Sequence, residues 1–494
     1  MKHQPNIIAL DWRASPAELA ARWPRDQRLL WLHSGRLHPR WARWSILASP
    51  TATFRFERGR SHLEGDLPET LAKARLTHDA LRDLNKVLAA TAVDAKSLPV
   101  TESSLPFRGG WIGNISYDLG RVIEPRAQYV ARDEKESRWP LIELAWCANA
   151  LIFDHVLQRW SAIGEIPACL NEISEGTLDD GFALGTIESN IAADEYERMV
   201  ACTIEYIAAG DIFQANIAQT FRAPFTGSSR ALAIEAFDRA QPWYGAYLEL
   251  GGELGASPPL ANCRALLSLS PELFLHSTPP PHPRRIITRP IKGTRPAACD
   301  PRELRDSIKD QAELNMIVDL MRNDLGRVCE FGSVRVPQPR VIETHPTVHH
   351  GVAEITGRLR DGASFSDVLR ATFPPGSVTG AQKIRAMQII DELESCQPRG
   401  PYCGAIGFIS DGGAMTLNVA IRTMLLEGER ENDRCGVLHS GEMSYSAGAG
   451  IVADSIPARE QQETLDKAAV VRELMNGLRN QNPGRREMCP RSDG

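Results

Sequence analysis

Short apolar runs separated by polar and turn-forming residues dominate the first 165 residues of the chain. The runs RWSILASPTATFRF (43–56) and PLIELAWCANALIFDHV (140–156) are strand-like. A polar stretch around 68–92 has helical character, and the glycine-rich FRGGWIGNISYDLGR (107–121) predicts a turn. The segment 166–185 has the composition of a loop.

Helical and strand-like patterns follow one another from about residue 186 onward. After Ser189 or Asn190, either of which is a suitable N-cap, apolar residues recur with helical spacing as far as Gly210, where a strand is expected. The runs LLSLSPELFLH and RRIITRPIKG alternate like paired antiparallel strands. Further elements are predicted as long helices at roughly 301–326 and 380–394, strands near 403–426, and a helix from about 457 to 477.

This order of elements indicates an α+β fold, because strands neighbour strands and helices come in blocks, whereas a parallel fold alternates the two. We divide the chain into an N-terminal region (1–165), a motif-dense region (186–478) and a polar tail (479–494) that is expected to be disordered.

The composition of the chain limits the kinds of molecule that it is expected to bind and the compartment in which it is expected to work. The chain has 56 Lys and Arg against 62 Asp and Glu, a net charge of −6, which gives no reason to expect nucleic acid or an anionic membrane as a partner. No run of eighteen apolar residues and no signal peptide is found. The ten cysteines are scattered without a CxxC pair, which is typical of reduced thiols in a cytosolic protein.

One lysine lies in a conformationally constrained segment. In TRPIKGTRP, Lys292 stands between two Arg-Pro pairs, and Gly293 after it permits a turn that a side chain would obstruct. A solvated surface lysine needs no such surroundings. Lys292 is therefore a candidate for a nitrogen held in place for chemistry.

Two pairs of acidic residues have helical i, i+3 spacing: Asp310 with Glu313, and Glu460 with Glu463. Each pair presents its oxygens on one helix face, and two such faces opposite each other would suit Mg²⁺. The alternative is that they are solvated or paired with Lys and Arg.

Two glycine-containing loops are candidates for anion binding. The segment YSAGAGIVADS (445–455) allows close backbone approach to a ligand, or it is only a tight bend. FPPGSVTGAQK (373–383) places Thr379 and Gly380 where a helix is expected to begin, which suits a carboxylate or plain N-capping.

Three further polar positions interrupt apolar sequence. Arg422 lies in a strand-like run and needs an anion, either a structural carboxylate or one on a substrate. His349 and His350 have the pattern of structural or surface histidines, and Glu272 follows a proline at a strand end, where an ordinary edge charge is the alternative.

Taken together and in order, these segments closely resemble the chorismate-utilising enzymes, a family that includes the anthranilate, aminodeoxychorismate, isochorismate and salicylate synthases. The resemblance covers about 186–475, and FRGGWIGNISYDLGR and WLHSG resemble the family's component I extension. The motifs are GDIFQANIAQTF, SLSPELF, TRPIKGTRP, AELNMIVDLMRNDLGR, VHHGVAEITGRL, FPPGSVTGAQK, GPYCGAIGF, LNVAIRTM and GAGIVADSIPAREQQET.

The resemblance implies a fold of two stacked, largely antiparallel sheets flanked by helices, with the active site between them. It implies that Glu313 and Glu463 hold Mg²⁺ and that Asp310, where the family has Glu, and Glu460 support them. Glu272 matches the general acid that protonates the departing C4 hydroxyl. The positions that match substrate-binding groups are Arg422, Tyr402, Gly448, Gly450, Thr379, Gly380 and His350.

Two positions distinguish branches of the family. Gln214 stands where the water-using synthases carry a lysine base, and an amide cannot deprotonate water. Lys292 gives the PIKGT of the aminodeoxychorismate branch, whereas anthranilate synthases typically have PIAGT. In the former branch this lysine is a nucleophile, so a site that desolvates it and lowers its pKa is expected.

The resemblance therefore implies a cytosolic synthase subunit that aminates chorismate at C4, with ammonia from a separate glutaminase subunit and a separate lyase for the next step. The alternative is anthranilate formation, with amination at C2 and loss of pyruvate. A member of the family that binds chorismate without turnover is a third possibility.

Overall fold

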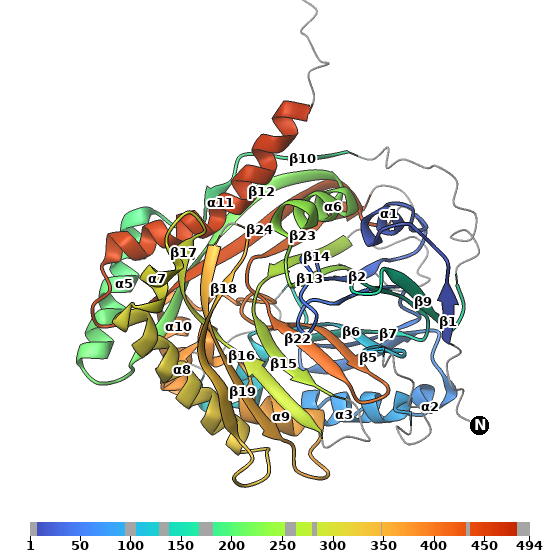
Figure 1. Cartoon of the computed structure of the whole chain (residues 1–494), viewed down its shortest axis with the longest axis horizontal. Coiled ribbons are helices and arrows are strands. Elements are labelled where there is room, and N and C mark those ends of the chain that lie inside the picture. Colours follow the sequence, from blue (N-terminus) through green and yellow to red (C-terminus); the bar gives the residue numbers. More distant parts are fainter. Residues whose placement is uncertain are drawn as a thin grey trace, which may run out of the picture.

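The computed structural model describes residues 7–93, 105–127, 138–166, 181–251, 263–278, 284–346, 348–430 and 435–481. Two antiparallel sheets account for the strands of these residues, and helices cover their outer faces (Figure 1). The tail predicted at 479–494 begins too early, because residues 479–481 belong to helix α11 (Pro457–Gln481). Residues from 482 onward and most of the predicted loop at 166–185 lie outside the described residues.

The first sheet has thirteen strands. In spatial order they are β1 (Ile7–Leu10), β9 (Arg159–Ile163), β8 (Ala150–Asp154), β3 (Trp44–Ala48), β2 (Leu30–His33), β13 (Tyr244–Leu250), β14 (Cys263–Ser270), β23 (Thr423–Arg430), β24 (Val437–Ile451), β12 (Gln214–Ser228) and β10 (Phe182–Leu184), with β11 (Glu188–Ser189) and β20 (Gly380–Ala381) also paired to β12.

The second sheet has eleven strands. They are β17 (Ile291–Pro296), β19 (Val348–Arg358), β16 (Arg285–Arg289), β15 (Leu273–Ser277), β22 (Met415–Val419), β21 (Ala405–Ser410), β6 (Gly110–Ile115), β7 (Ile142–Cys147), β4 (Ala52–Glu57) and β5 (Arg60–Gly65), with β18 (Arg335–Thr344) paired to β19.

The helices lie on the outside of this pair of sheets. They are α1 (Pro16–Ala21), α2 (Glu69–Ala72), α3 (Ala80–Thr91), α4 (Leu119–Ile123), α5 (Ala193–Ala208), α6 (Ser229–Ala240), α7 (Pro301–Arg305), α8 (Ile308–Gly326), α9 (Phe365–Thr372), α10 (Lys383–Leu393) and α11 (Pro457–Gln481). In Figure 1, α1, α6 and α11 cover one face, and α3, α8 and α9 cover the opposite one.

Apolar side chains hold the layers together. Ile46 and Leu248 of the first sheet share one buried cluster with Ile112 and Phe408 of the second, which shows that the sheets are stacked. A second cluster joins the outer face of the first sheet to α1 and α6, and a third joins the outer face of the second sheet to α3, α8 and α9. The predicted α+β fold with two stacked antiparallel sheets is confirmed.

Both sheets contain strands from before residue 165 and after residue 186. In the first sheet β2 pairs with β13, so that Leu30 lies opposite Leu248. In the second sheet β6 pairs with β21, so that Ile115 lies opposite Ala405. The N-terminal region is therefore hydrogen-bonded into the same two sheets as the motif-dense region.

The prediction of a glycine-rich turn at 107–121 was wrong, because this segment contains the central strand β6 and helix α4. Its glycines serve close packing of strands. A Cβ on Gly113 would overlap the backbone of Glu143, and one on Gly110 would overlap that of Ile409. Fully buried on both faces, β6 does not show the alternation of a half-exposed strand.

Two boundaries also differ from the sequence expectation. Helix α5 begins after Ala192, because Ser189 pairs in β11 and the Asn190 side chain accepts a hydrogen bond from the Thr220 amide, so neither caps the helix. Residues 182–184, expected in a loop, form β10 against β12. The expected pairing of LLSLSPELFLH with RRIITRPIKG is confirmed by β15 and β16.

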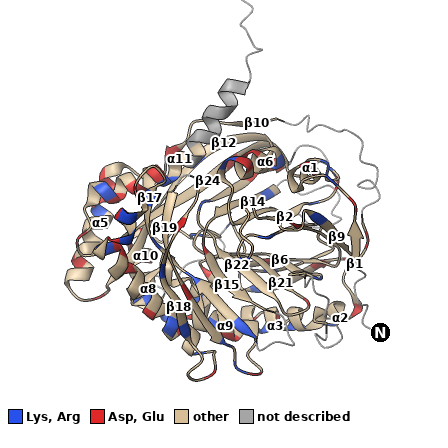
Figure 2. Ribbon diagram, in the orientation of Figure 1, with Lys and Arg blue, Asp and Glu red and all other residues tan. Residues whose placement is uncertain are grey.

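Figure 2 shows Lys and Arg interspersed with Asp and Glu on α5 and α8. Among the described helices none is both long enough and apolar enough to cross a membrane.

One buried ion pair within the motif-dense region is also hydrogen-bonded to the N-terminal region. Arg230 at the start of α6 donates to both carboxylate oxygens of Glu249 on β13, at 2.6 and 2.9 Å, and also to the carbonyls of Trp23 and Gln27. The side chains of Arg230 and Glu249 are 1% and 2% exposed. The pair therefore has almost no access to water.

We expect Arg230→Met to lower the free energy of unfolding by about 3–5 kcal/mol, because it leaves the Glu249 carboxylate buried and unpaired. Chemical denaturation measures this. Arg222→Met is the matched control, since the Arg222–Glu442 pair is 50% and 42% exposed and its loss is expected to cost less than about 1 kcal/mol. Equal losses in the two variants would contradict the interpretation.

Candidate active site

The start of β12 brings several of the predicted site residues together. In the pairing of β12 with β24, Asn216 lies opposite Gly450 and Ala218 lies opposite Gly448. On its other edge β12 pairs with β20, so that Gln214 lies opposite Ala381 and Ala215 opposite Gly380. Segments more than 160 residues apart in the sequence thus meet at one strand end.

Lys292 reaches this strand end from the second sheet. Its amine nitrogen Nζ lies 3.1 Å from the point that a Cβ on Gly450 would occupy, and the Gln214 side-chain nitrogen lies closer still to the same point. Because glycine has no side chain there, the lysine amine and the glutamine amide share the space above Gly450. The structure therefore brings together Lys292, Gly450 and Gln214.

The turn expected at Gly293 is not formed, because Lys292 and Gly293 lie within strand β17, which is irregular at this point. Gly293 has φ of +81°, and β17 shifts register against β19 between Ile291 and Thr294. A Cβ on Gly293 would lie 3.0 Å from side-chain atoms of Asp310. A residue without a side chain is therefore needed both for the conformation and for the approach of α8.

Desolvation lowers the pKa of the Lys292 amine, while the carboxylates of Glu313 and Glu272 act in the opposite direction. The lowered pKa increases the fraction of neutral amine, which is the form that can act as a nucleophile.

Glu272 is 2% exposed and lies between β14 and β15. Burial raises its pKa from 4.5 to about 7, opposed by the nearby Ser377 side chain, by the Ile291 amide, which donates to Oε1 at 3.3 Å, and by the charge of Lys292. At neutral pH a substantial fraction of this carboxyl group is protonated. It is therefore suited to donate a proton.

His350 and Arg422 are neighbours. Arg422 NH2 lies 3.5 Å from Nε2 of His350, whose Nδ1 lies 3.0 Å from the Thr294 hydroxyl. Desolvation and the nearby Arg422 hold the pKa of His350 well below its usual value, so the imidazole is neutral. His349 is buried as well, so neither histidine is a surface residue.

Arg422 was expected within a strand, but it occupies a bend with φ of +51° immediately before β23. Desolvation lowers its pKa, and among the described residues no carboxylate forms an ion pair with it. Of the two partners considered for Arg422, a carboxylate on a bound molecule fits this position better than a structural one.

Thr379 and Gly380 do not begin a helix, contrary to the sequence expectation. Thr379 ends a short 3-10 turn and donates its hydroxyl to the Pro375 carbonyl, whereas Gly380 pairs in β20. Helix α10 begins only at Lys383. A Cβ on Gly380 would overlap the Gln214 backbone, so this glycine is needed for strand contact.

The Tyr402 hydroxyl lies directly beside Gly448. A Cβ on Gly448 would stand 2.9 Å from the Tyr402 hydroxyl and 2.8 Å from the Asn216 side-chain nitrogen. The tyrosine ring is 4% exposed, and burial raises the pKa of its hydroxyl well above its usual value. Tyr402 therefore presents a neutral hydroxyl beside the glycine strand.

The four acidic residues lie near one another on α8 and α11. Burial raises the pKa of Glu313, and Asp310 and Glu460 add repulsion. Burial likewise raises that of Glu460, with repulsion from Glu463. Such mutually repelling oxygens suit a hard cation.

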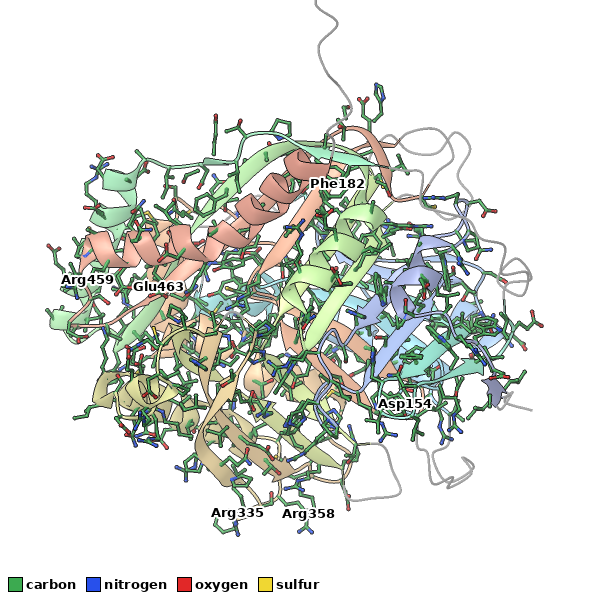
Figure 3. The ribbon with its side chains drawn as sticks, turned by 45° about the horizontal axis from the view of Figure 1, so that its top comes forward. Asp154, Phe182, Arg335, Arg358, Arg459 and Glu463 are labelled. Carbon is green, nitrogen blue, oxygen red and sulfur yellow. The ribbon has the colours of Figure 1, made fainter. Side chains whose placement is uncertain are left out.

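Two of these carboxylates already have cationic partners. Asp310 accepts from Arg295 at 2.7 Å, and Glu463, labelled in Figure 3, accepts from Lys467 at 2.7 Å. Burial acts to raise the pKa of Glu463, but Lys467 lowers it below its usual value. In the described part of the chain no three acidic, histidine or cysteine side chains are already arranged as a metal site.

Sequence reasoning did not identify several residues that support this site, namely Ser377, Lys467, Tyr117 and Arg399. Lys467 has a sequence signal, since it follows Glu463 at i+4 on α11. It also donates to the Gly448 carbonyl at 2.7 Å, which connects the carboxylates to the glycine strand.

Glu272→Gln should change the pH dependence of stability. Because the folded-state pKa is raised from 4.5 to about 7, the wild-type protein loses stability as pH rises through this interval. Relative to wild type, the variant should gain about 2–3 kcal/mol between pH 5 and pH 8.5, at about 1.4 kcal/mol per pKa unit.

Denaturant unfolding at both pH values measures this difference. Glu195→Gln, on the exposed first turn of α5, controls for the loss of one negative charge. A gain that does not depend on pH would contradict the assignment of a protonated, buried Glu272.

Known proteins resemble this chain over most of its length. The family model described as chorismate binding enzyme matches residues 29–473. Aminodeoxychorismate synthase component 1 of Escherichia coli (strain K12) is 36% identical over 478 residues, which cover 94% of this chain and 97% of the relative. Anthranilate synthase component 1 1 of Haloarcula marismortui is 41% identical over 427 residues, 78% of this chain and 79% of the relative.

Among solved structures, anthranilate synthase component I from Streptococcus pneumoniae TIGR4 is similar with a TM-score of 0.68 and 29% identity, covering 93% of this chain and 98% of that one. The family match extends over most of the chain and includes every residue of the site described above. The chain belongs to the chorismate binding enzyme family.

Proposed function

We propose that the protein is an enzyme that converts chorismate and ammonia to 4-amino-4-deoxychorismate, as the synthase subunit of an aminodeoxychorismate synthase. The observation that carries the proposal is the position of the Lys292 amine, beside Gly450 and Gln214 and within the electrostatic influence of Glu272. The near-full-length similarity to proteins named aminodeoxychorismate synthase component 1 supports it.

The first step uses the Lys292 amine and the Glu272 carboxyl group. The neutral Lys292 amine forms a bond to C2 of chorismate, both ring double bonds shift by one position around the ring, and the bond from C4 to its hydroxyl oxygen breaks. Glu272 donates its proton to that oxygen, which leaves as water, and the lysine adduct loses one proton. The pKa shifts favour this pairing, since at neutral pH the carboxyl group can hold a proton and the amine is more readily neutral.

The second step reverses the shift of the two double bonds. Ammonia adds at C4, both double bonds return, and the C2–nitrogen bond breaks, so that Lys292 is released as an amine with one proton taken from the incoming nitrogen. Gln214 favours ammonia over water as the incoming group, because its amide has no basic site that could deprotonate water.

The substrate would be held through its carboxylates. Arg422, which has no carboxylate partner among the described residues, and the Tyr402 hydroxyl are placed to bind them, together with the backbone of Gly448 and Gly450. Neutral His350 and Thr379 would lie around the ring. Mg²⁺ would be held by Glu313 and Glu463 with support from Asp310 and Glu460, and when bound it would neutralise a substrate carboxylate.

The ammonia is proposed to come from a separate glutaminase subunit. The similar proteins are named component 1, a name that implies a second component, and 4-amino-4-deoxychorismate is the precursor that a lyase would convert to p-aminobenzoate for folate synthesis.

Anthranilate synthesis is the second candidate. The 41% identity to an anthranilate synthase component favours it, although over a smaller share of the chain. The two candidates share substrate, metal and partner type and differ in the carbon that receives the nitrogen. Lys292 is the residue that argues for C4.

A product assay tests the proposal. Purified protein with chorismate, Mg²⁺ and excess ammonium at alkaline pH should give p-aminobenzoate only when a 4-amino-4-deoxychorismate lyase is added, with products resolved by mass and fluorescence. Lys292→Ala should lower product formation by at least about 100-fold, because the covalent route is lost. Anthranilate formed without the lyase would overturn the proposal.

Intact-mass measurement after a quench, with ammonia omitted, should show an adduct of chorismate less water on wild type and none on Lys292→Ala. Lys73→Ala, directly after α2, where the lysine is 71% exposed, is the control and should keep both adduct and activity. An undiminished adduct on Lys292→Ala would contradict the role of this lysine.

Magnesium binding can be tested without turnover. Adding Mg²⁺ to metal-free protein should raise the melting temperature, because a ligand that binds only the folded state stabilises by about 2.7 kcal/mol at one hundred times its Kd. Glu313→Gln and Glu463→Gln should each reduce the rise, and Glu195→Gln should retain it. The same rise in all four proteins would rule out these carboxylates as ligands.

A further inference from the structure

Arg399 is buried between two tyrosine rings that come from different parts of the chain. Its guanidinium carbon lies 4.8 Å from the centre of the Tyr117 ring and 5.8 Å from that of the Tyr402 ring. The side chain is 4% exposed. A cation in this position is attracted to both rings with little screening by water.

Every guanidinium nitrogen also has a polar partner. Nε and NH2 donate to the two carboxylate oxygens of Glu394, at 2.9 and 2.5 Å. NH2 donates in addition to the Asn216 carbonyl at 2.6 Å, and NH1 to the Val378 carbonyl at 3.4 Å. This planar arrangement cannot be reproduced by a lysine, which carries one compact charged group.

These contacts link Arg399 to the residues that are proposed to bind chorismate. Val378 directly precedes Thr379, and the Asn216 amide donates to the Thr379 carbonyl at 2.9 Å. The Asn216 side chain faces the same point above Gly448 as the Tyr402 hydroxyl. Arg399 therefore contacts Tyr402 directly. It is linked to Thr379 through Val378 and Asn216.

Gly400, the residue after Arg399, is hydrogen-bonded to the N-terminal region. The Tyr117 amide donates to the Gly400 carbonyl at 2.8 Å, and the Gly400 amide donates to the Asp118 carboxylate at 2.8 Å. Glu394, which holds the guanidinium, also accepts from the Ala218 amide of β12. The arginine thus has little freedom to move independently of β6, β12 or α10.

We propose that Arg399 is a positioning residue of the chorismate site: held between Tyr117 and Tyr402 and bonded to Glu394 and the Asn216 carbonyl, it fixes the Tyr402 hydroxyl and Thr379 in the arrangement that receives the substrate. The proposal rests on the proposed function only in that chorismate occupies this site. It assigns to the N-terminal region, through Tyr117, an indirect part in substrate binding.

The test removes the aromatic ring of Tyr117 and leaves the buried ion pair between Arg399 and Glu394 in place. Tyr117→Leu should raise the Kd for chorismate with Mg²⁺, measured by titration calorimetry, by about tenfold, while kcat changes less than about threefold. Tyr402 would bind substrate and transition state alike, so its misplacement affects KM more than kcat. A purely structural role would lower the active fraction and leave Kd unchanged.

A double-mutant cycle tests whether the effect passes through Tyr402. Tyr402→Leu should also raise Kd, and the double variant Tyr117→Leu/Tyr402→Leu should have nearly the Kd of Tyr402→Leu alone. Independent effects, in which the two fold-changes multiply, would overturn the proposal. If Tyr117→Leu does not fold, Arg399→Lys is used in the same cycle.

Tyr206→Leu is the matched control, because Tyr206 also stacks on an arginine, with Arg385 at 5.2 Å from the ring centre, on α5 away from Tyr402. It should change Kd less than twofold, and a tenfold change would overturn the proposal. Because chorismate binding is measured directly, formation of anthranilate in the product assay would reject the proposed function and leave this test unaffected.

Discussion

The long antiparallel pairing of β12 with β24 is the constraint on which the rest of the structure depends. Each strand has fifteen residues, and their register is continuous from Ala215 and Ile451 to Phe225 and Gly441. The outer face of this pair packs against α5 and α11. Gln214 and the glycines of the site lie where β12 begins and β24 ends. A shift of one residue would turn Gly450 and Gly448 away from their neighbours and replace them by side chains that do not fit.

Burial determines the chemistry at this strand end. The same desolvation moves the pKa of Glu272 upward and that of Lys292 downward, so the two groups approach each other in proton affinity although their ordinary values are far apart. A proton donor and a nucleophile can then coexist near neutral pH. This arrangement stores unfavourable free energy in the folded protein, and the extensive apolar contact between the sheets offsets it.

The fold class, most elements and the order of the site segments could be predicted from the sequence, because periodicity and motif spacing are local. What could not be predicted depends on partners distant in sequence. Asn190 has the chemistry of an N-cap, but it is engaged by Thr220. Gly110 and Gly113 have the composition of a turn, but they serve contact between central strands. Arg399 stands in a polar, loop-like sequence, and only the fold shows that it lies between Tyr117 and Tyr402.

The interleaving of the two regions in both sheets has a consequence for synthesis on the ribosome. Strand β2 emerges about two hundred residues before its partner β13, and β6 emerges almost three hundred before β21. Until then these apolar strands have unpaired edges, and contacts of such long sequence separation form slowly. The nascent N-terminal half is therefore exposed to pairing with other chains until its later partner strands have been synthesised.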